Sequence, residues 1–329
     1  MFRAFLTLAF VSLMQPALAL CNGDSLLDRL SQADRYYLDD VVADTPYGRG
    51  LIWQATRGDQ HITFVGTMHI YDPRLEPIRN RIQDDIANAD LILLEMTQAE
   101  EAELQAELAT NPARMFLTDG PSLIDLLDEQ TWDMVAEAAS ARQIPRFLAA
   151  KFRPWYLAVT LAIPPCAMPD MVTGRRGLDH MILEDANTAG VPTQALEPWH
   201  TLFDVMDVGT LDEQIDMMRL GLLSPQINAE MFVAMLDGYF AGEVAQIWEM
   251  SRLSLQFIPD MDIAVAEEMF AMTEQSLLID RNRNWIPVIE AAALKHERIV
   301  VAVGAAHLPG EVGVLRLLER EGWMINAAD

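Results

Sequence analysis

The sequence predicts an α/β fold with a central, mainly parallel sheet and large helical insertions. Short apolar runs with strand character occur at 62–66, 90–95, 192–196 and 298–304, and helical patterning separates each from the next. This alternation is typical of parallel sheets with helices packed on them. The β-branched sequences ITFV and IVVAV fit strands that are buried on both faces.

The first residues have the pattern of a secretory signal peptide. Arg3 is followed by an apolar run from Ala4 to Met14 and by the small-residue sequence ALA at 17–19. We expect cleavage after Ala19 and a periplasmic or secreted protein. The run is too short for a membrane anchor, the bulky Leu20 disfavours lipidation of Cys21, and no later segment is long enough to span a membrane.

The mature chain, 20–329, is predicted to be one α/β domain with helical insertions at about 100–163 and 211–278. In the first, SLIDLLDEQTWDMVAEAA starts with Ser122 as a helix cap and has apolar residues at close to the helical period. In the second, AEMFVAMLDGYFAGEVAQIWEM has the same character. Both insertions are candidates for a lid over the edge of the sheet.

The cysteine content and the net charge indicate in which compartment the protein works and which partners it can have. Cys21 and Cys166 are the only two cysteines, and in an oxidising compartment such a pair indicates a structural disulfide. The formal net charge of −26 repels phosphate backbones and anionic lipid heads. Nucleic acid is therefore not an expected partner, and the oligomeric state is left open.

A G-x-x-H motif follows two of the predicted strands. Gly66 and Gly304 end the two apolar runs, and His69 and His307 come three residues later. Ligands of open α/β sheets bind beyond the carboxyl ends of the strands, and glycine permits a sharp turn and a close backbone approach there. We expect both imidazoles at one rim of the sheet.

Carboxylates and other polar residues occur in similar positions. The sequences LILLEM and PTQALEP each place a glutamate at the end of an apolar strand, where a charge is costly unless it is paired. RRGLDH and LIDRNRNW add further candidates. The predicted polar cluster consists of His69, His307, Glu95, Glu197, Asp179, His180, Arg281 and Asn282.

The residue types allow two kinds of hydrolytic chemistry. His69, Glu95 and His307 are a reasonable ligand set for a divalent metal (Mn, Co or Zn) that activates water. Without a metal, one histidine can act as general base while Arg281 stabilises an oxyanion. The sequence contains no H-E-x-x-H, G-x-S-x-G, P-loop or G-x-G-x-x-G motif.

These motifs resemble the TraB/GumN family, which includes the Tiki metalloproteases. The matching sequences, in family order, are FVGTMHIYDPR, LILLEM, GLDHMILEDANTAGVPTQALEP, DRNRNW and VAVGAAHLPGEVGVLRLLEREGW. The resemblance implies a fold like that of ChaN and the erythromycin esterases, with a polar cleft at one sheet edge. Asp179, Glu197 and Asn282, with Gly66 and Gly304, are expected to support the site or bind substrate.

The family resemblance implies three activities. The Tiki relatives imply metal-dependent peptide cleavage through His69, Glu95 and His307, the erythromycin esterases imply metal-independent hydrolysis, and ChaN implies haem binding without catalysis. Our leading hypothesis is an exported hydrolase, a metal-dependent peptidase acting on peptides or small molecules. The alternative is a binding protein for a metal, haem or small ligand, in which Tyr156, Tyr239 and several methionines face the ligand.

Overall fold

The computed structural model describes residues 21, 23–259 and 261–328. Its six-stranded sheet has the order β4-β3-β5-β2-β1-β6. The strands are β1 (Ile52–Arg57), β2 (Gln60–Thr67), β3 (Leu91–Leu94), β4 (Thr193–Ala195), β5 (Arg298–Gly304) and β6 (Met324–Ala327). Strands β4, β3, β5 and β2 correspond to the four predicted runs and are parallel, so the predicted fold class is confirmed. The predicted signal peptide and its cleavage site lie outside the described residues.

Two antiparallel strands, β1 and β6, were not among the predicted elements. Strand β1 pairs with β2 through a tight turn at Gly58, where φ is 63°, and β6 pairs with β1 on its outer side. Both strands are only partly buried, because they lie toward the sheet edge. They therefore lack the continuous apolar run that identifies the inner strands. The Gly-Asp turn between β1 and β2 is the sequence signal for this hairpin.

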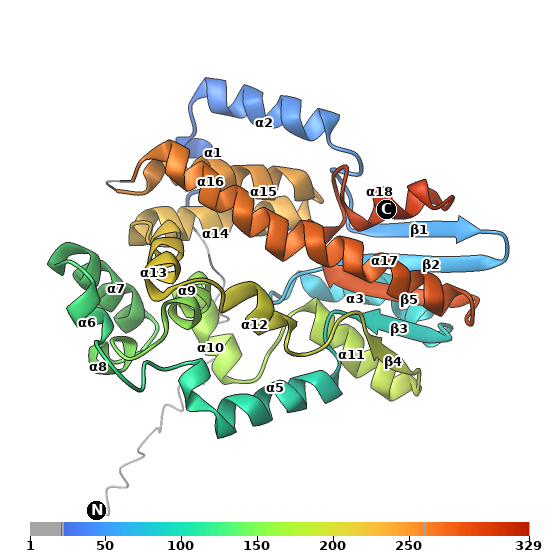
Figure 1. Ribbon diagram of the computed structural model, residues 1–329. Coiled ribbons are helices and arrows are strands. Elements are labelled where there is room, and N and C mark those ends of the chain that lie inside the picture. The colour runs from blue at the N-terminus through green and yellow to red at the C-terminus, as the bar shows by residue number, and fades with distance from the viewer. Residues whose placement is uncertain (1–20, 22, 260, 329) are drawn as a thin grey trace, which may run out of the picture.

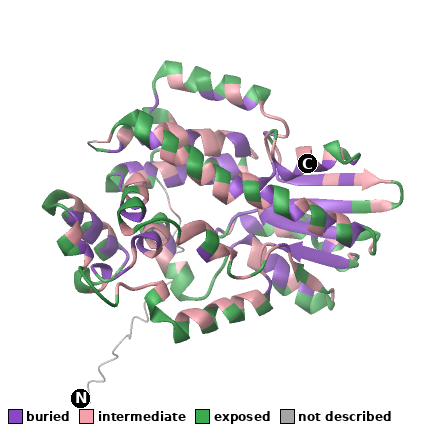
Figure 2. Ribbon diagram, in the orientation of Figure 1, coloured by how far each residue is buried: buried purple, intermediate pink, exposed green. Residues whose placement is uncertain are grey.

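Helices cover both faces of the sheet. Alternate residues of β5 enter different cores: Val300 and Ala302 face one layer, while Val301 and Val303 face the other. The first layer contains α3 (Leu75–Arg81), α4 (Gln83–Ala87), α11 (Leu178–Ala189) and part of α14 (Pro225–Phe240). The second contains α17 (Asp280–Ala293), which crosses the sheet in Figure 1, and α18 (Val314–Arg320). Figure 2 shows the central strands as the most buried part of this sandwich.

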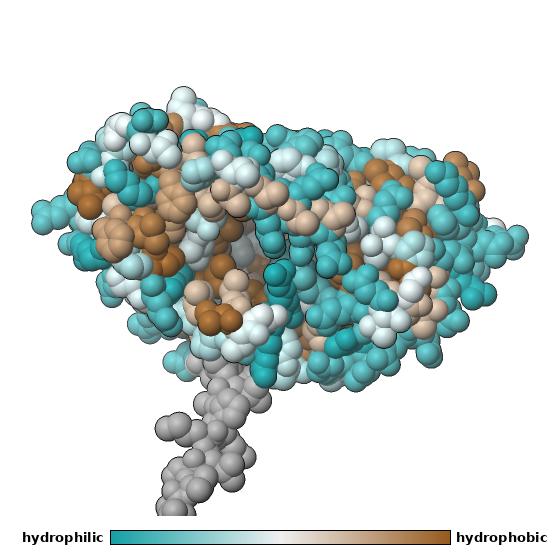
Figure 3. Space-filling view, turned by 90° about the horizontal axis from the view of Figure 1, so that it is seen from below, coloured by the Kyte–Doolittle hydropathy of each residue, from teal (hydrophilic) through white to brown (hydrophobic). Residues whose placement is uncertain are grey.

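The remaining helices form a second half beside the sheet (Figure 1). One core joins α6 (Leu123–Leu126), α7 (Glu129–Ala141), α8 (Arg146–Ala149), α9 (Pro154–Ala162) and α13 (Leu211–Leu220). Another joins α1 (Leu26–Arg29), α14, α15 (Val244–Leu253), η3 (Ser254–Phe257) and α16 (Ile263–Glu274). In Figure 3, hydrophobic side chains gather at the left end, over this helical half.

The other described elements lie between these groups in the chain. They are α2 (Gln32–Asp44), α5 (Gln98–Thr110), η1 (Pro112–Arg114), η2 (Pro165–Ala167), α10 (Met168–Val172), α12 (Thr201–Met206) and η5 (Ala305–His307). Helices occupy both segments predicted as insertions, but the second does not stop at 278. It continues through a π-helical turn, Gln275–Ile279, directly into α17. None of the described helices is both long enough and apolar enough to cross a membrane.

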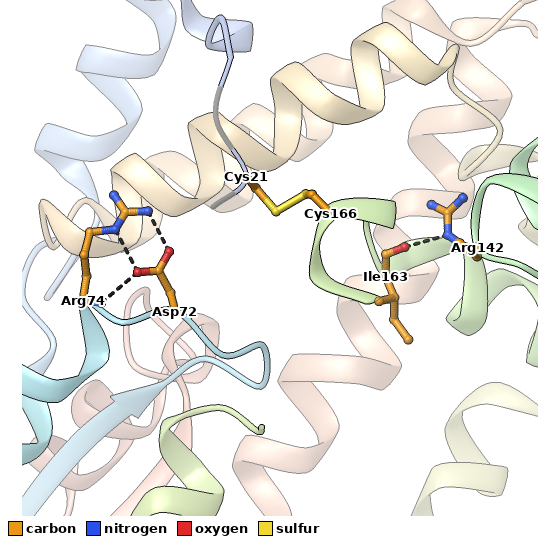
Figure 4. Close-up of a disulfide and its surroundings, with 6 residues drawn as sticks. All are labelled: Cys21, Asp72, Arg74, Arg142, Ile163 and Cys166. Atoms are coloured by element: carbon orange, nitrogen blue, oxygen red, sulfur yellow. Dashed lines mark hydrogen bonds and ion pairs between the residues drawn. A yellow bond between two sulfur atoms is a disulfide. The ribbon is translucent and has the colours of Figure 1, made fainter. Parts of the chain in front are cut away.

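The predicted disulfide between Cys21 and Cys166 is present, with a Cα–Cα distance of 5.4 Å. Figure 4 shows that it joins the start of the described chain to the loop after α9. Buried Arg142 fixes the same loop, because its guanidinium donates to the carbonyl oxygens of Ile163 at 2.6 Å and Leu161 at 2.5 Å. The disulfide closes a sequence separation of 145 residues, so it restricts the unfolded chain strongly.

We predict that reduction of the disulfide lowers the free energy of unfolding by about 2–4 kcal/mol, because it releases this long loop. Urea unfolding followed by tryptophan fluorescence, with and without reductant, measures the change. The double variant Cys21→Ser/Cys166→Ser is the control and should match the reduced protein with or without reductant. Equal stability of the oxidised and reduced wild type would contradict the prediction.

Candidate active site

The two G-x-x-H motifs converge because β2 and β5 are parallel neighbours. Thr67, the last residue of β2, lies opposite Gly304, the last residue of β5. A Cβ atom on Gly304 would lie 3.3 Å from Glu95 Oε1, 3.5 Å from His307 Cδ2 and 3.9 Å from His69 Nε2. A Cβ atom at this position would press on Glu95, and glycine leaves the three functional groups room to approach the strand end.

Gly66 is needed for a similar reason. A Cβ atom there would lie 2.9 Å from a methyl group of Leu308 and 3.2 Å from the Cα of Ala305. Its carbonyl oxygen accepts a hydrogen bond from the buried hydroxyl of Tyr239 in α14, at 2.9 Å. The end of β2 is thus fixed from both sides, and His69 starts from a rigid position.

Arg281, in the first turn of α17, connects the polar groups on one side of the site. Its Nη2 donates to Glu95 Oε2 and to Glu197 Oε1, both at 2.6 Å, and its Nε donates to Glu197. Its Nη1 lies 3.2 Å from the carbonyl oxygen of Leu277 and 3.2 Å from His307 Nε2. All five N–H groups are therefore engaged. We call Arg281, Glu95, Glu197, His307 and Asn282 the Arg281 network.

His307 is a neutral, fully paired member of this network. Its Nδ1 lies 2.7 Å from Asn282 Oδ1, an acceptor, so Nδ1 bears the hydrogen and Nε2 accepts from Arg281. The ring packs on Trp285 with a centroid distance of 4.4 Å. Burial and the nearby guanidinium lower the pKa of His307 to about 3. The imidazole is 5% exposed and is part of the scaffold of the site.

Glu95 is ionised although it is buried. Burial alone would raise its pKa, but the charges of Arg281 and His69 and the backbone N–H of Gly304, which donates to Oε1 at 2.7 Å, outweigh burial and hold the pKa below its usual value. The partner carboxylate, Glu197, also accepts from the Trp285 indole at 2.9 Å. One guanidinium thus neutralises part of the charge of two buried carboxylates, as burial of charges requires.

A second set of side chains surrounds His69. Its Nδ1 lies 3.3 Å from Asp179 Oδ2, and the same oxygen lies 2.9 Å from His180 Nδ1. His180 Nε2 contacts Glu101 Oε1, and Arg176 lies 3.5 Å from that carboxylate. We call His69, Asp179, His180 and Glu101 the His69 network. It joins β2, α11 and α5.

The two networks differ in exposure and protonation. The His69 side chain is 66% exposed, in contrast to His307. The ion pair with Asp179 raises the pKa of His69 to about 9 despite desolvation, and hydrogen bonds with Asp179 and Glu101 raise the pKa of His180 to about 9. Burial opposes ionisation of Asp179, but the two imidazoles hold its pKa well below the usual range.

Gly177 positions α11 against His69. Its N–H donates to His69 O at 3.0 Å, and the next N–H, from Leu178, donates to Met68 O at 2.9 Å. A Cβ atom on Gly177 would lie 1.9 Å from Met68 O and 2.4 Å from the carbonyl carbon of His69. Only glycine fits here, and this close approach brings Asp179 to the imidazole.

A pocket lies between the networks, at the carboxyl ends of β2, β3 and β5. Its polar lining comes from both networks, and its apolar wall comes from strand ends and α11. The lining residues are Thr67, His69, Leu94, Glu95, Met96, Glu101, Asp179, His180, Leu183 and Ala302. Glu95 is the residue that belongs to the Arg281 network and also faces this pocket.

The structure brings all the predicted site residues to one edge of the sheet, but it separates them by environment. His69, Glu95 and Asp179 line the pocket, whereas buried Asn282 and Arg281, whose side chain is 13% exposed, are not among its lining residues. The expected oxyanion contact from Arg281 is not available, because its donors are occupied. His61 and His200 lie on the surface, outside both networks.

His180 was predicted as part of the polar cluster, and the structure places its Nδ1 2.9 Å from Asp179 Oδ2. Two other residues of the site, Glu101 and Thr67, were not predicted. Glu101 lies in a charged helix without any distinguishing pattern, so only the tertiary structure identifies it. Thr67 lies inside the first G-x-x-H motif.

Glu95 and His307 were expected to hold a metal with His69. The Arg281 guanidinium lies against both Glu95 Oε2 and His307 Nε2, so a metal ion at these atoms would have to displace a cation. Among the described residues, no group of three or more His, Cys, Asp or Glu side chains is arranged as a metal site. As arranged, these residues do not fit a metal centre.

Comparison with known protein families gives one result. Residues 51–327 match the sequence model of the TraB/PrgY/gumN family, and this range contains the sheet, both networks and the helical half except α1. No curated protein matches the chain.

We predict that stability is highest near pH 6.5. His307 has a lowered pKa in the fold, so stability falls as the pH drops from about 6.5 toward 3, by up to about 1.4 kcal/mol per pH unit. His69 and His180 have raised pKa values, so their contribution is lost as the pH rises from about 6.5 to 9. Urea unfolding at a series of pH values measures both limbs.

The variant His307→Gln should flatten the acid limb between about pH 6.5 and 4.5, because glutamine removes the titrating ring, whereas the fall below pH 4.5 that Glu95 and Asp179 cause should stay. His61→Gln, which replaces an exposed histidine on β2, is the matched control and should keep the wild-type slope. An unchanged acid slope in His307→Gln would show that another group is responsible.

Proposed function

Because the chain belongs to the TraB/PrgY/gumN family, we propose that it is an exported hydrolase that cleaves ester or amide bonds, with His69 as general base. The disulfide supports export, since disulfides form and persist in oxidising compartments. A periplasmic location after removal of 1–19 is part of this proposal.

The observation that supports the proposal most strongly is the His69–Asp179 pair. Asp179 faces Nδ1 of an imidazole whose ring is 66% exposed, so the other nitrogen, Nε2, is directed to the strand ends near Gly304. A carboxylate behind an imidazole orients the ring and stabilises its protonated form. His307 lacks this freedom, because both of its nitrogens are paired inside the fold.

The proposed step uses a water molecule as the nucleophile. Its oxygen forms a bond to the substrate carbonyl carbon, the C=O π electrons move to the carbonyl oxygen, and neutral His69 takes the proton. When the tetrahedral intermediate collapses, the bond to the leaving oxygen or nitrogen breaks and His69 returns the proton to it. The Arg281 network keeps Glu95 ionised beside this site, where its charge favours the imidazolium.

The metal-dependent reaction implied by the Tiki relatives has less support, because Arg281 occupies the side of Glu95 and His307 that a metal would need. Tyr239 does not support the haem alternative, because its buried hydroxyl donates a hydrogen bond to the carbonyl oxygen of Gly66. We therefore propose metal-independent hydrolysis, and peptides or small esters remain the substrate classes. The apolar wall of Leu94, Met96 and Leu183 favours a small apolar group beside the reacting carbonyl.

We predict that His69→Gln lowers the rate of hydrolysis by about 10²- to 10⁴-fold, the usual contribution of a general base. Stability should hardly change above pH 9, where His69 is neutral in the wild type and its ion pair with Asp179 no longer contributes. Hydrolysis of 4-nitrophenyl acetate and of alanine 4-nitroanilide, with thermal unfolding, measures both effects.

The matched control is His200→Gln. His200 is also an exposed imidazole, and its Nδ1 lies 2.9 Å from Asp204, but it is not among the residues that line the pocket. This variant should hydrolyse both probes at the wild-type rate. Wild-type rates of probe hydrolysis in His69→Gln would contradict the proposal that His69 is the general base.

We further predict that kcat/KM rises with pH and levels off at an apparent pKa between 6.5 and about 9, because the base must lose its proton. In Asp179→Asn the apparent pKa should move down toward 6.5, since the ion pair that favours the imidazolium is gone. A pH–rate profile from 5 to 10 gives both values. A flat profile in the wild type would exclude His69 as the base.

A further inference from the structure

The pocket contains a buried hydroxyl that the fold leaves unpaired. Thr67, the last residue of β2, is 3% exposed, and among the described residues its Oγ1 has no hydrogen-bond partner. Asp179 lines the same pocket, and its Oδ1 likewise has no hydrogen-bond partner among the described residues. Buried polar groups are almost always hydrogen-bonded, so an unpaired one needs an explanation.

Another buried threonine on the same strand, Thr63, has a fully hydrogen-bonded hydroxyl. Thr63 is 5% exposed and lies on the same face of β2, four residues earlier. Its hydroxyl donates to Asp85 Oδ1 at 2.9 Å and accepts from Gln54 Nε2 at 2.9 Å. A threonine is therefore readily satisfied on this face, and the difference at Thr67 is that it lines the pocket.

The proposed reaction needs a donor that the Arg281 network does not provide. Negative charge develops on the substrate carbonyl oxygen when water adds to the carbon, and enzymes place hydrogen-bond donors at that atom. The expected donor, Arg281, has all its N–H groups engaged. A threonine hydroxyl rotates to suit its acceptor and can serve instead.

We infer that Thr67 donates its hydroxyl hydrogen to the carbonyl oxygen of the substrate, while Asp179 Oδ1 accepts from a donor on the same ligand. This inference rests on the proposed hydrolysis and adds a second catalytic residue to His69. The substrate must therefore present a carbonyl oxygen together with an N–H or O–H group, which describes an amide or a peptide better than a simple ester.

The test compares Thr67→Val with Thr63→Val, two changes of the same shape on one strand face. Thr67→Val breaks no bond within the fold, so its melting temperature should equal or exceed that of the wild type. Thr63→Val leaves Asp85 and Gln54 without this partner, so its melting temperature should fall. Thermal unfolding at one pH gives both values.

Activity supplies the second measurement, with alanine 4-nitroanilide as the probe. Thr67→Val should lose about 100-fold or more in kcat, Thr67→Ser should regain most of it because the hydroxyl returns, and Thr63→Val should keep the wild-type rate below its melting temperature. A fall in the melting temperature of Thr67→Val like that of Thr63→Val would overturn the inference, and so would full activity in Thr67→Val. Failure of the wild type to hydrolyse either probe would instead reject the proposed function.

Discussion

The ion pairs of Arg281 with Glu95 and Glu197 are the interactions on which the rest of the site depends. Two carboxylates are buried at the ends of neighbouring strands, β3 and β4, and burial of unpaired charges would be strongly unfavourable. One guanidinium compensates both at 2.6 Å and also fixes the tautomer of His307. The π-helical turn before α17 provides the Leu277 carbonyl that completes its hydrogen bonding.

These ion pairs give the two histidines different roles. Both occur in G-x-x-H motifs at the ends of adjacent parallel strands, but His307 is buried with both ring nitrogens paired, whereas the His69 side chain is 66% exposed. His307 is held by Asn282, Arg281 and Trp285 in the interior. His69 is held only by Asp179, through a helix that reaches it because Gly177 has no side chain. The reactive group in our account is accordingly His69, and the second motif is its support.

The sequence identified the parallel core and the edge at which the site lies, because apolar runs that end in Gly66, Glu95 and Gly304 report both burial and strand ends. Apolar runs alone did not identify β1 and β6, because each has exposed residues that interrupt the apolar pattern; for β1 the Gly-Asp turn at Gly58 was the available signal. The sequence placed Arg281 and Asn282 in the site but assigned Arg281 a contact with substrate. The pairing of its donors depends on Glu197 and Leu277, which only the tertiary structure brings together, and the same is true of Glu101 in the His69 network.

The central claim is that hydrolysis needs no metal, because Arg281 lies where a metal at Glu95 and His307 would bind. The most direct measurement is hydrolysis of alanine 4-nitroanilide by protein dialysed against EDTA, before and after addition of Mn, Co or Zn. Our account predicts an unchanged rate after chelation and no gain from added metal. Loss of activity on chelation, with recovery when a metal is added, would show that the reaction depends on a metal ion. This result would contradict metal-independent hydrolysis.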